Sequence, residues 1–244
     1  MSFVTLAVIM TKIANNLQTV RARIASACRA AGRDPAEVSL LVVSKTFGAE
    51  AVEAAYAAGQ TAFGENYIQE AVQKITQLRH LPLQWHCIGP IQSNKTRLVA
   101  EHFDWVHTVD RLKIAQRLSE QRPPELPPLQ VCIQVNVDGG VTKSGVAPSE
   151  ALALAQAVAV LPHLRLRGIM CIPEPAPDFV AACALLAGAR AIFDVLTAAG
   201  LALDTVSMGM SADLEAAIQE GSTMVRVGSA IFGGRAYPQA VETL

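Results

Sequence analysis

The sequence predicts an α/β fold, a single (β/α)8 TIM barrel with an extra N-terminal helix. Eight short apolar segments alternate with helix-like segments along the 244 residues, and this alternation is typical of a parallel sheet covered by helices. The chain length and the count of strands both suit closure into one barrel. An open doubly wound sheet is the alternative, but no Gly-x-Gly-x-x-Gly motif follows an early strand.

The predicted elements follow from residue patterns, taken in chain order. The first helix, 11–31, has apolar residues three and four positions apart and ends at Gly32. The later strands are short apolar runs, and the later helices are rich in Ala, Leu, Glu and Gln. The predicted strands are 39–44, 61–64, 84–88, 104–108, 129–136, 165–170, 203–206 and 223–228. The other predicted helices are 49–58, 66–78, 93–101, 110–121, 148–160, 177–199, 211–219 and 236–242.

Residues 1–10 are predicted to be an N-terminal extension before a natural start at Met10, and residues 11–244 to be a single domain. The apolar stretch 3–10 lacks the basic segment of a signal peptide and is too short to cross a membrane. No repeat or linker divides the rest of the chain.

The composition indicates a large core and little charged surface. Hydrophobic residues make up 51% of the chain and charged residues 17%, so extensive disorder is not expected. A net charge of −1 without a basic cluster argues against nucleic-acid binding. The five cysteines show no disulfide or zinc-ligand spacing, which indicates reduced thiols in a cytoplasmic protein. A monomer is expected, and the low charge also permits a dimer.

The strand 39–44 is followed by Lys45, the lysine in the most informative position. The residues of this strand are apolar or small and no turn former interrupts them, which predicts burial on both faces. A lysine at the mouth of such a strand is partly desolvated, and the loss of solvation favours the free amine that forms Schiff bases with carbonyl groups. A lysine whose head group reaches back to water is the structural alternative.

Two clusters of small residues follow the seventh and eighth predicted strands. Ser207-Met208-Gly209-Met210-Ser211 follows one strand, and Gly228-Ser229 follows the other. Small residues let a ligand approach exposed backbone N–H groups, and these two loops are the usual phosphate site of such barrels. Ordinary helix caps would produce the same residues.

A lysine and a phosphate site in one barrel mouth suggest pyridoxal 5'-phosphate, abbreviated PLP. Arg226 lies in the last buried strand, between Val225 and Val227. An arginine facing the pyridine nitrogen would keep that nitrogen unprotonated, because two adjacent cations repel each other. A salt bridge inside the barrel is the alternative role for Arg226.

The sequence also resembles a known family, the pyridoxal phosphate homeostasis proteins (YggS/PROSC), from Met10 to Arg235. The resemblance rests on motifs in the family's order. They are Val43-Ser-Lys-Thr46, Phe63-Gly-Glu-Asn-Tyr67, Trp85-His86, Ile88-Gly-Pro90, Gln92-Ser-Asn-Lys95, Lys143-Ser-Gly145, Leu166-Arg-Gly-Ile-Met170, Ser207-Met-Gly-Met-Ser211 and Gly221-Ser-Thr-Met-Val-Arg-Val-Gly228. The sequence departs from the family at Phe47-Gly48, where Lys-Pro is usual, and at Cys87, where an aromatic residue is common.

The resemblance implies a barrel similar to the N-terminal domain of alanine racemase, with PLP as a Schiff base on Lys45. It implies that Arg226 faces the pyridine nitrogen and that Asn66 lies near the ring. It also implies a phosphate site around Ser207, Met208, Ser211, Gly228 and Ser229. His86 and His107 are further candidates for lining the site, and a histidine satisfied within the core is the alternative for each.

The family is regarded as binding and buffering PLP, supplying it to apo enzymes and affecting amino-acid and keto-acid balance, without established turnover. Racemases of this barrel type add a C-terminal β-domain, and a chain ending at Leu244 is expected to have no room for one. A true PLP enzyme, such as a weak amino-acid racemase, is the second hypothesis. A Schiff-base aldolase that uses Lys45 without PLP is the third.

Overall fold

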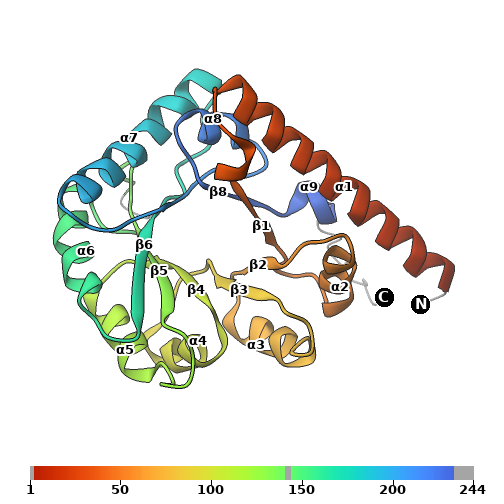
Figure 1. Ribbon diagram of the computed structural model, residues 1–244, viewed down its shortest axis with the longest axis horizontal. Helices are drawn as coiled ribbons and strands as arrows, with labels where there is room; N and C mark the ends of the chain where they lie inside the picture. The colour runs from red at the N-terminus through yellow and green to blue at the C-terminus, as the bar shows by residue number, and fades with distance from the viewer. Residues whose placement is uncertain (1–2, 141–143, 234–244) are drawn as a thin grey trace, which may run out of the picture.

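The structure, a computed structural model, describes residues 3–140 and 144–233. It confirms the predicted fold class, because eight parallel strands pair in chain order and close into a barrel (Figure 1). Each strand lies within two residues of its predicted position. The strands are β1 (Ser39–Val43), β2 (Ala62–Glu65), β3 (Gln84–Cys87), β4 (Trp105–Val109), β5 (Leu129–Gln134), β6 (Leu164–Met170), β7 (Thr205–Ser207) and β8 (Met224–Val227).

Helices surround the barrel, and most of them occupy their predicted positions. They are α1 (Phe3–Ala30), α2 (Ala49–Ala57), α3 (Ile68–Gln77), α4 (Thr96–His102), α5 (Leu112–Gln121), α6 (Ala151–Ala159), α7 (Phe179–Ala198), α8 (Leu214–Gln219) and α9 (Ser229–Phe232). Three short 3-10 helices are η1 (Pro35–Glu37), η2 (Ser93–Lys95) and η3 (Pro148–Glu150). The sequence patterns missed α9, and the predicted helix 236–242 lies outside the described residues.

The first helix is longer than predicted. It begins at Phe3 rather than at Thr11, so the described part of the predicted extension continues the helix. No glycine or proline separates Phe3 from Thr11, and a helix propagates readily through such a sequence once it is nucleated. The predicted apolar stripe from Ile13 to Cys28 is buried, and α1 packs across α2, α8 and α9 (Figure 1).

The barrel interior is more polar than the layer between strands and helices. Side chains alternate along each strand, so every second residue points inward. The buried polar side chains on the strands include His86, His107, Ser207 and Arg226. Two small apolar groups lie apart from the main core. One contains Leu41, Ile88 and Met224, and the other contains Trp105, Cys132 and Met170.

The helix α7 is long and apolar enough, by length and composition, to cross a membrane. This is weak evidence, because a helix that covers the core of a soluble protein passes the same test. In the structure α7 packs against β6 and α8. Its residues Leu186, Ala189, Phe193 and Leu196 are buried there.

One glycine is required for β6 and β7 to pair. Gly168 is opposite Thr205 in the sheet, and a Cβ atom on residue 168 would lie 1.7 Å from the carbonyl oxygen of Thr205. The clash is with backbone atoms, which cannot move without breaking the ladder. The glycine in the Leu166–Met170 motif therefore has a structural role.

We expect Gly168→Ala to lower the free energy of unfolding by about 3 kcal/mol or more, because β6 and β7 must separate. Gly188→Ala, in α7, is the matched control, since a Cβ atom on Gly188 would have no neighbour within 4 Å. That change should raise stability by up to about 1 kcal/mol through helix propensity. Urea unfolding measures both, and equal stability of the two variants would contradict this role for Gly168.

Candidate cofactor-binding site

A pocket of about 360 Å³ lies at the carboxyl end of the barrel. It is formed where β1 ends and where the loops after β7 and β8 begin, which is the end that carries active sites in such barrels. Its lining residues are Val43, Lys45, Thr46, Phe47, Met210, Ser211, Ala212, Arg226, Gly228, Ser229 and Gly233. The predicted lysine, the predicted arginine and both predicted small-residue loops thus meet at one cavity.

Pairing between the first and last strands brings these residues together. Leu41 of β1 is opposite Arg226 of β8, and Val42 is opposite Val227. Just beyond this ladder, a Cβ atom on Gly228 would lie 2.8 Å from the carbonyl oxygen of Val43. Glycine at position 228 therefore lets the end of β8 approach the end of β1, two residues before Lys45.

The loop that carries Lys45 is held by a buried ammonium group. Lys74 of α3 donates to the carbonyl oxygens of Ser44 and Phe47, each at 2.9 Å, on both sides of Lys45. The same ammonium forms ion pairs with Glu65 at 2.6 Å and with Glu70 at 2.9 Å. Lys74 thereby fixes the backbone that positions Lys45.

The carboxylates of Glu65 and Glu70, which pair with Lys74, also bind the loop that carries Lys45. Glu65 accepts from the hydroxyl of Ser44 at 2.6 Å, and Glu70 accepts from the backbone N–H of Thr46 at 2.9 Å. Thr46 has a left-handed backbone with φ of 68°, a strained conformation for a residue other than glycine. Burial raises the pKa of Glu65, and the adjacent Lys74 ammonium opposes that shift.

Sequence reasoning missed Lys74, although the sequence contains a signal for it. Ile68, Ala71, Lys74 and Leu78 are three or four positions apart, so Lys74 lies in the buried stripe of α3. A charged residue in such a stripe requires a buried partner. Which partner it has depends on the neighbouring strands, and the sequence of the helix does not name them.

Arg226 is buried, and backbone groups hold it in place. Its guanidinium donates to the carbonyl oxygen of Ser207 at 2.7 Å, to the hydroxyl of Ser207 at 2.8 Å and to the carbonyl oxygen of Cys171 at 2.8 Å. Burial lowers the pKa of Arg226. Arginine keeps its proton across the physiological range, so the group remains a cation beneath the pocket. These three bonds do not use all five N–H groups of a guanidinium.

The two loops beside the pocket present hydroxyl groups and backbone N–H groups. The hydroxyls of Ser211 and Ser229 lie 3.4 Å apart. No described residue accepts a hydrogen bond from the backbone N–H of Gly228 or Ser229. Helix α1 supports both loops, because Arg23 donates to the Ser211 carbonyl at 3.2 Å and Asn16 donates to the Ile231 carbonyl at 2.7 Å. The arrangement suits an anion at this edge of the pocket.

Four of the predicted site residues do not line the pocket. Ser207 directs its hydroxyl to Arg226 and His107, and Met208 is packed in the core. Asn66 lies behind the site, where its backbone packs against Gly89, and its Oδ1 is buried without a hydrogen-bond partner among the described residues. His86 is buried inside the barrel and contacts His107 and Gln84.

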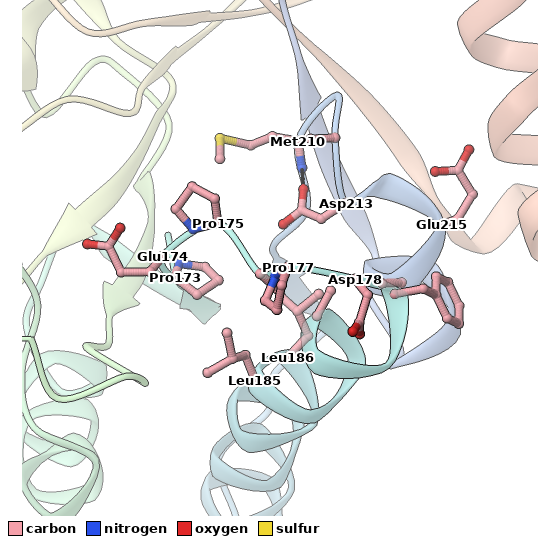
Figure 2. A pocket seen from close by; sticks show the side chains of 15 residues that line it. Pro173, Glu174, Pro175, Pro177, Asp178, Leu185, Leu186, Met210, Asp213 and Glu215 are labelled. Atoms are coloured by element: carbon pink, nitrogen blue, oxygen red, sulfur yellow. Dashed lines mark hydrogen bonds between the residues drawn. The ribbon is translucent and has the colours of Figure 1, made fainter.

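A second pocket, of about 300 Å³, lies beside the first between the β6–α7 loop and α8. Figure 2 shows Glu174, Asp178, Asp213 and Glu215 around it, with Asp213 accepting from the backbone N–H of Met210 at 2.6 Å. These carboxylates would repel a phosphate group. The chemistry of an anionic cofactor therefore favours the pocket that holds Lys45 and Arg226.

Comparisons with known proteins identify the family of this chain. A family model described as "Alanine racemase, N-terminal domain" matches residues 11–236. A pyridoxal phosphate homeostasis protein of Pseudomonas aeruginosa is 62% identical over 228 residues, which cover 93% of this chain and 98% of that protein. The chain belongs to this family.

Solved structures extend the comparison to the fold. PipY of Synechococcus elongatus, solved with PLP bound, is 38% identical, with a TM-score of 0.79 over 91% of this chain and 100% of that chain. Alanine racemase of Corynebacterium glutamicum is 19% identical, with a TM-score of 0.68 over 93% of this chain and 62% of that chain. The second likeness is one of fold alone.

We expect Lys74→Met to lower the free energy of unfolding by about 3–5 kcal/mol, because it leaves the Glu65 carboxylate buried without its partner. Lys74→Met combined with Glu65→Leu should lose less than Lys74→Met alone, since the unpaired charge is then gone. Lys113→Met, at an exposed lysine of α5, is the control and should change stability by less than about 0.5 kcal/mol. Urea titrations measure all three. A double variant less stable than Lys74→Met would contradict the pairing.

Stability should also fall in acid because of the buried histidines. Burial lowers the pKa of His86 to about 3, whereas the unfolded chain protonates this residue below about pH 6.5. Only the unfolded state then gains a proton between these values, so stability is lost as the pH falls through this window. We expect His86→Asn to reduce the slope of stability between pH 6 and 5 by about 1.4 kcal/mol per pH unit.

Urea unfolding at several pH values measures that slope. His80→Asn, at an exposed histidine, is the control for the substitution itself. Equal slopes in His86→Asn and in the unmodified protein would show that His86 takes up a proton in the folded state.

Proposed function

We propose that this chain binds PLP in the pocket of Lys45 and takes part in intracellular PLP homeostasis. The observation that carries the proposal is the meeting of an amine, a buried cation and an anion-binding loop pair around one cavity. Membership in the family and the PLP-bound PipY structure support the same ligand. The pocket volume is in the usual range for a small-molecule site.

Each part of the pocket matches one part of the cofactor. The Lys45 amine would hold the aldehyde carbon as a Schiff base, with release of water. Ser211, Gly228 and Ser229 would bind the phosphate through hydroxyl and N–H groups. Arg226 would face the pyridine nitrogen, and Asn66, whose buried side-chain oxygen has no hydrogen-bond partner among the described residues, would lie near the ring. Ser207 and Met208 would act by shaping the β7 loop, since their side chains are engaged elsewhere.

Two features favour a role in binding the cofactor rather than in catalysing a reaction with it. Bound PLP supplies an electron sink for reactions at amino-acid carbons, and a cation at the ring nitrogen weakens that sink because it disfavours protonation of the nitrogen. Racemisation also needs groups that move protons on both faces of the substrate. The described lining of the pocket includes Lys45 but no tyrosine, histidine, cysteine or carboxylate.

The wider role follows from these properties. A protein that holds PLP reversibly can buffer it and deliver it to apo PLP enzymes, which affects amino-acid and keto-acid balance. We propose that this takes place in the cytoplasm and that the chain acts as a monomer, without nucleic-acid or membrane partners. The five free thiols are consistent with a reducing compartment.

We expect the purified chain to take up PLP and to show a visible absorption band that borohydride bleaches. Peptide mass mapping should then place the pyridoxyl group on the Lys45 peptide. Lys45→Ala should abolish the band and the modification, because the only proposed amine is gone. Lys113→Ala should retain both.

The same preparations separate the alternatives. A protein that remains colourless with added PLP would contradict the proposal, and trapping by borohydride with a keto substrate instead would favour an aldolase. Formation of the opposite enantiomer from an enantiopure amino acid, lost in Lys45→Ala, would establish a racemase. Negligible racemisation by a PLP-loaded protein is the result expected of a homeostasis protein.

A further inference from the structure

A chain of hydrogen bonds crosses the barrel interior beneath the pocket. Arg226 donates to the hydroxyl of Ser207 at 2.8 Å, and this hydroxyl lies 2.9 Å from Nδ1 of His107. Nε2 of His107 lies 2.9 Å from Nδ1 of His86, and Nε2 of His86 lies 3.0 Å from Oε1 of Gln84. The chain thus runs from the pocket floor to an exposed residue at the amino end of β3.

The Gln84 end of this hydrogen-bond chain fixes its direction. A guanidinium only donates hydrogen bonds, and an amide oxygen only accepts them. Between them, a hydroxyl and two neutral imidazoles can each accept one bond and donate one. Every contact is satisfied when Ser207 donates to Nδ1 of His107, His107 donates from Nε2 to His86, and His86 donates from Nε2 to Gln84. In the reverse direction the bare Nε2 of His86 would face the amide oxygen of Gln84, and two acceptors would meet.

The surroundings keep both imidazoles uncharged. His86 and His107 are completely buried, and His86 stacks on Trp105 with ring centroids 5.2 Å apart. The guanidinium of Arg167 lies 4.6 Å from the Trp105 ring centroid, on the same aromatic residue. Burial lowers the pKa of His107 well below its usual value, and the nearby Arg226 cation acts in the same direction.

The hydrogen-bond chain determines how the Ser207 hydroxyl is oriented toward Arg226. A serine hydroxyl without a partner can rotate among three staggered positions. Donation to His107 removes that freedom and leaves the oxygen lone pairs directed toward Arg226. The guanidinium is then held by two atoms of Ser207 and by the Cys171 carbonyl, which limits the positions from which it can meet a ligand.

We propose that His107 is a positioning residue for Arg226 and acts through Ser207 as the central link of this one-directional chain. It holds the Arg226 guanidinium in one orientation at the pocket floor. That orientation would set the protonation state of the pyridine nitrogen of a bound ring. The inference rests on the proposed function, because the ring in question is that of PLP.

The direction of the chain can be measured on the full-length, unmodified protein. Nitrogen-15 spectra of the histidine side chains at pH 7 report which ring nitrogen carries the proton, and His→Asn variants assign the signals. We expect a proton on Nε2 and a bare Nδ1 for both His86 and His107. A proton on Nδ1 of His107, or a charged imidazole at either position in the unmodified protein, would overturn the proposal.

Two substitutions at position 107 separate the two links of the chain. Asparagine places its amide near the position of Nδ1 and retains a partner for Ser207, whereas glutamine places its amide near the position of Nε2 and retains only the link to His86. We expect His107→Gln to raise the Kd for PLP about tenfold, the effect of losing one well-placed hydrogen bond. His107→Asn should change it by less than about threefold. Met170→Leu, a similar-sized change among buried interior residues, is the control.

The visible band of the PLP-loaded protein is the readout that a purely structural role would not move. The band of His107→Gln should shift in the same direction as that of Arg226→Gln, and combining the two changes should add no further shift. An unshifted band in His107→Gln, or additive shifts in the combined variant, would overturn the positioning role. An unmodified protein that binds no PLP would instead overturn the proposed function, and this inference with it.

Discussion

The pairing of β1 with β8 is the constraint on which the site depends. It closes the barrel, and its register sets Leu41 opposite Arg226 and Val42 opposite Val227. Lys45 and Arg226 are far apart in the sequence, and only closure places them at one cavity. The absence of a Cβ atom at Gly228 allows the final approach, because the backbone of Val43 fills the space that a side chain would need.

Three buried cations in this barrel donate hydrogen bonds to backbone carbonyl groups. Lys74 holds the loop on both sides of Lys45, and Arg226 joins the ends of β6 and β7. Arg122 similarly donates to the carbonyls of Ala100, Phe103 and Pro127 at the amino end of the barrel. Each cation binds carbonyl groups of at least one segment other than its own and so ties those segments together. The cost of burying such a charge is offset only while all its partners are present.

The electrostatic pattern separates the two neighbouring pockets. The pocket of Lys45 contains a cation, hydroxyl groups and backbone N–H groups, whereas the pocket in Figure 2 is bordered by carboxylates. Of these two pockets, the one that contains Lys45 is the one that suits an anion. The described lining of that pocket presents an amine, a guanidinium, hydroxyl groups and backbone N–H groups.

Local sequence patterns determined the fold class, the strand positions and five residues that line the pocket: Lys45, Ser211, Arg226, Gly228 and Ser229. These predictions were possible because strand ends and small-residue loops are local features of the sequence, and a parallel barrel places all of its strand ends on one side. The start of α1 at Phe3 was missed because residues 1–10 were interpreted as an extension before Met10, although nothing in the sequence there stops a helix. The burial of Lys74 and the engagement of Ser207 by His107 were decided by tertiary structure alone. A hydrogen bond between residues 100 positions apart depends on how distant strands face each other across the interior, and that arrangement exists only after the barrel has closed.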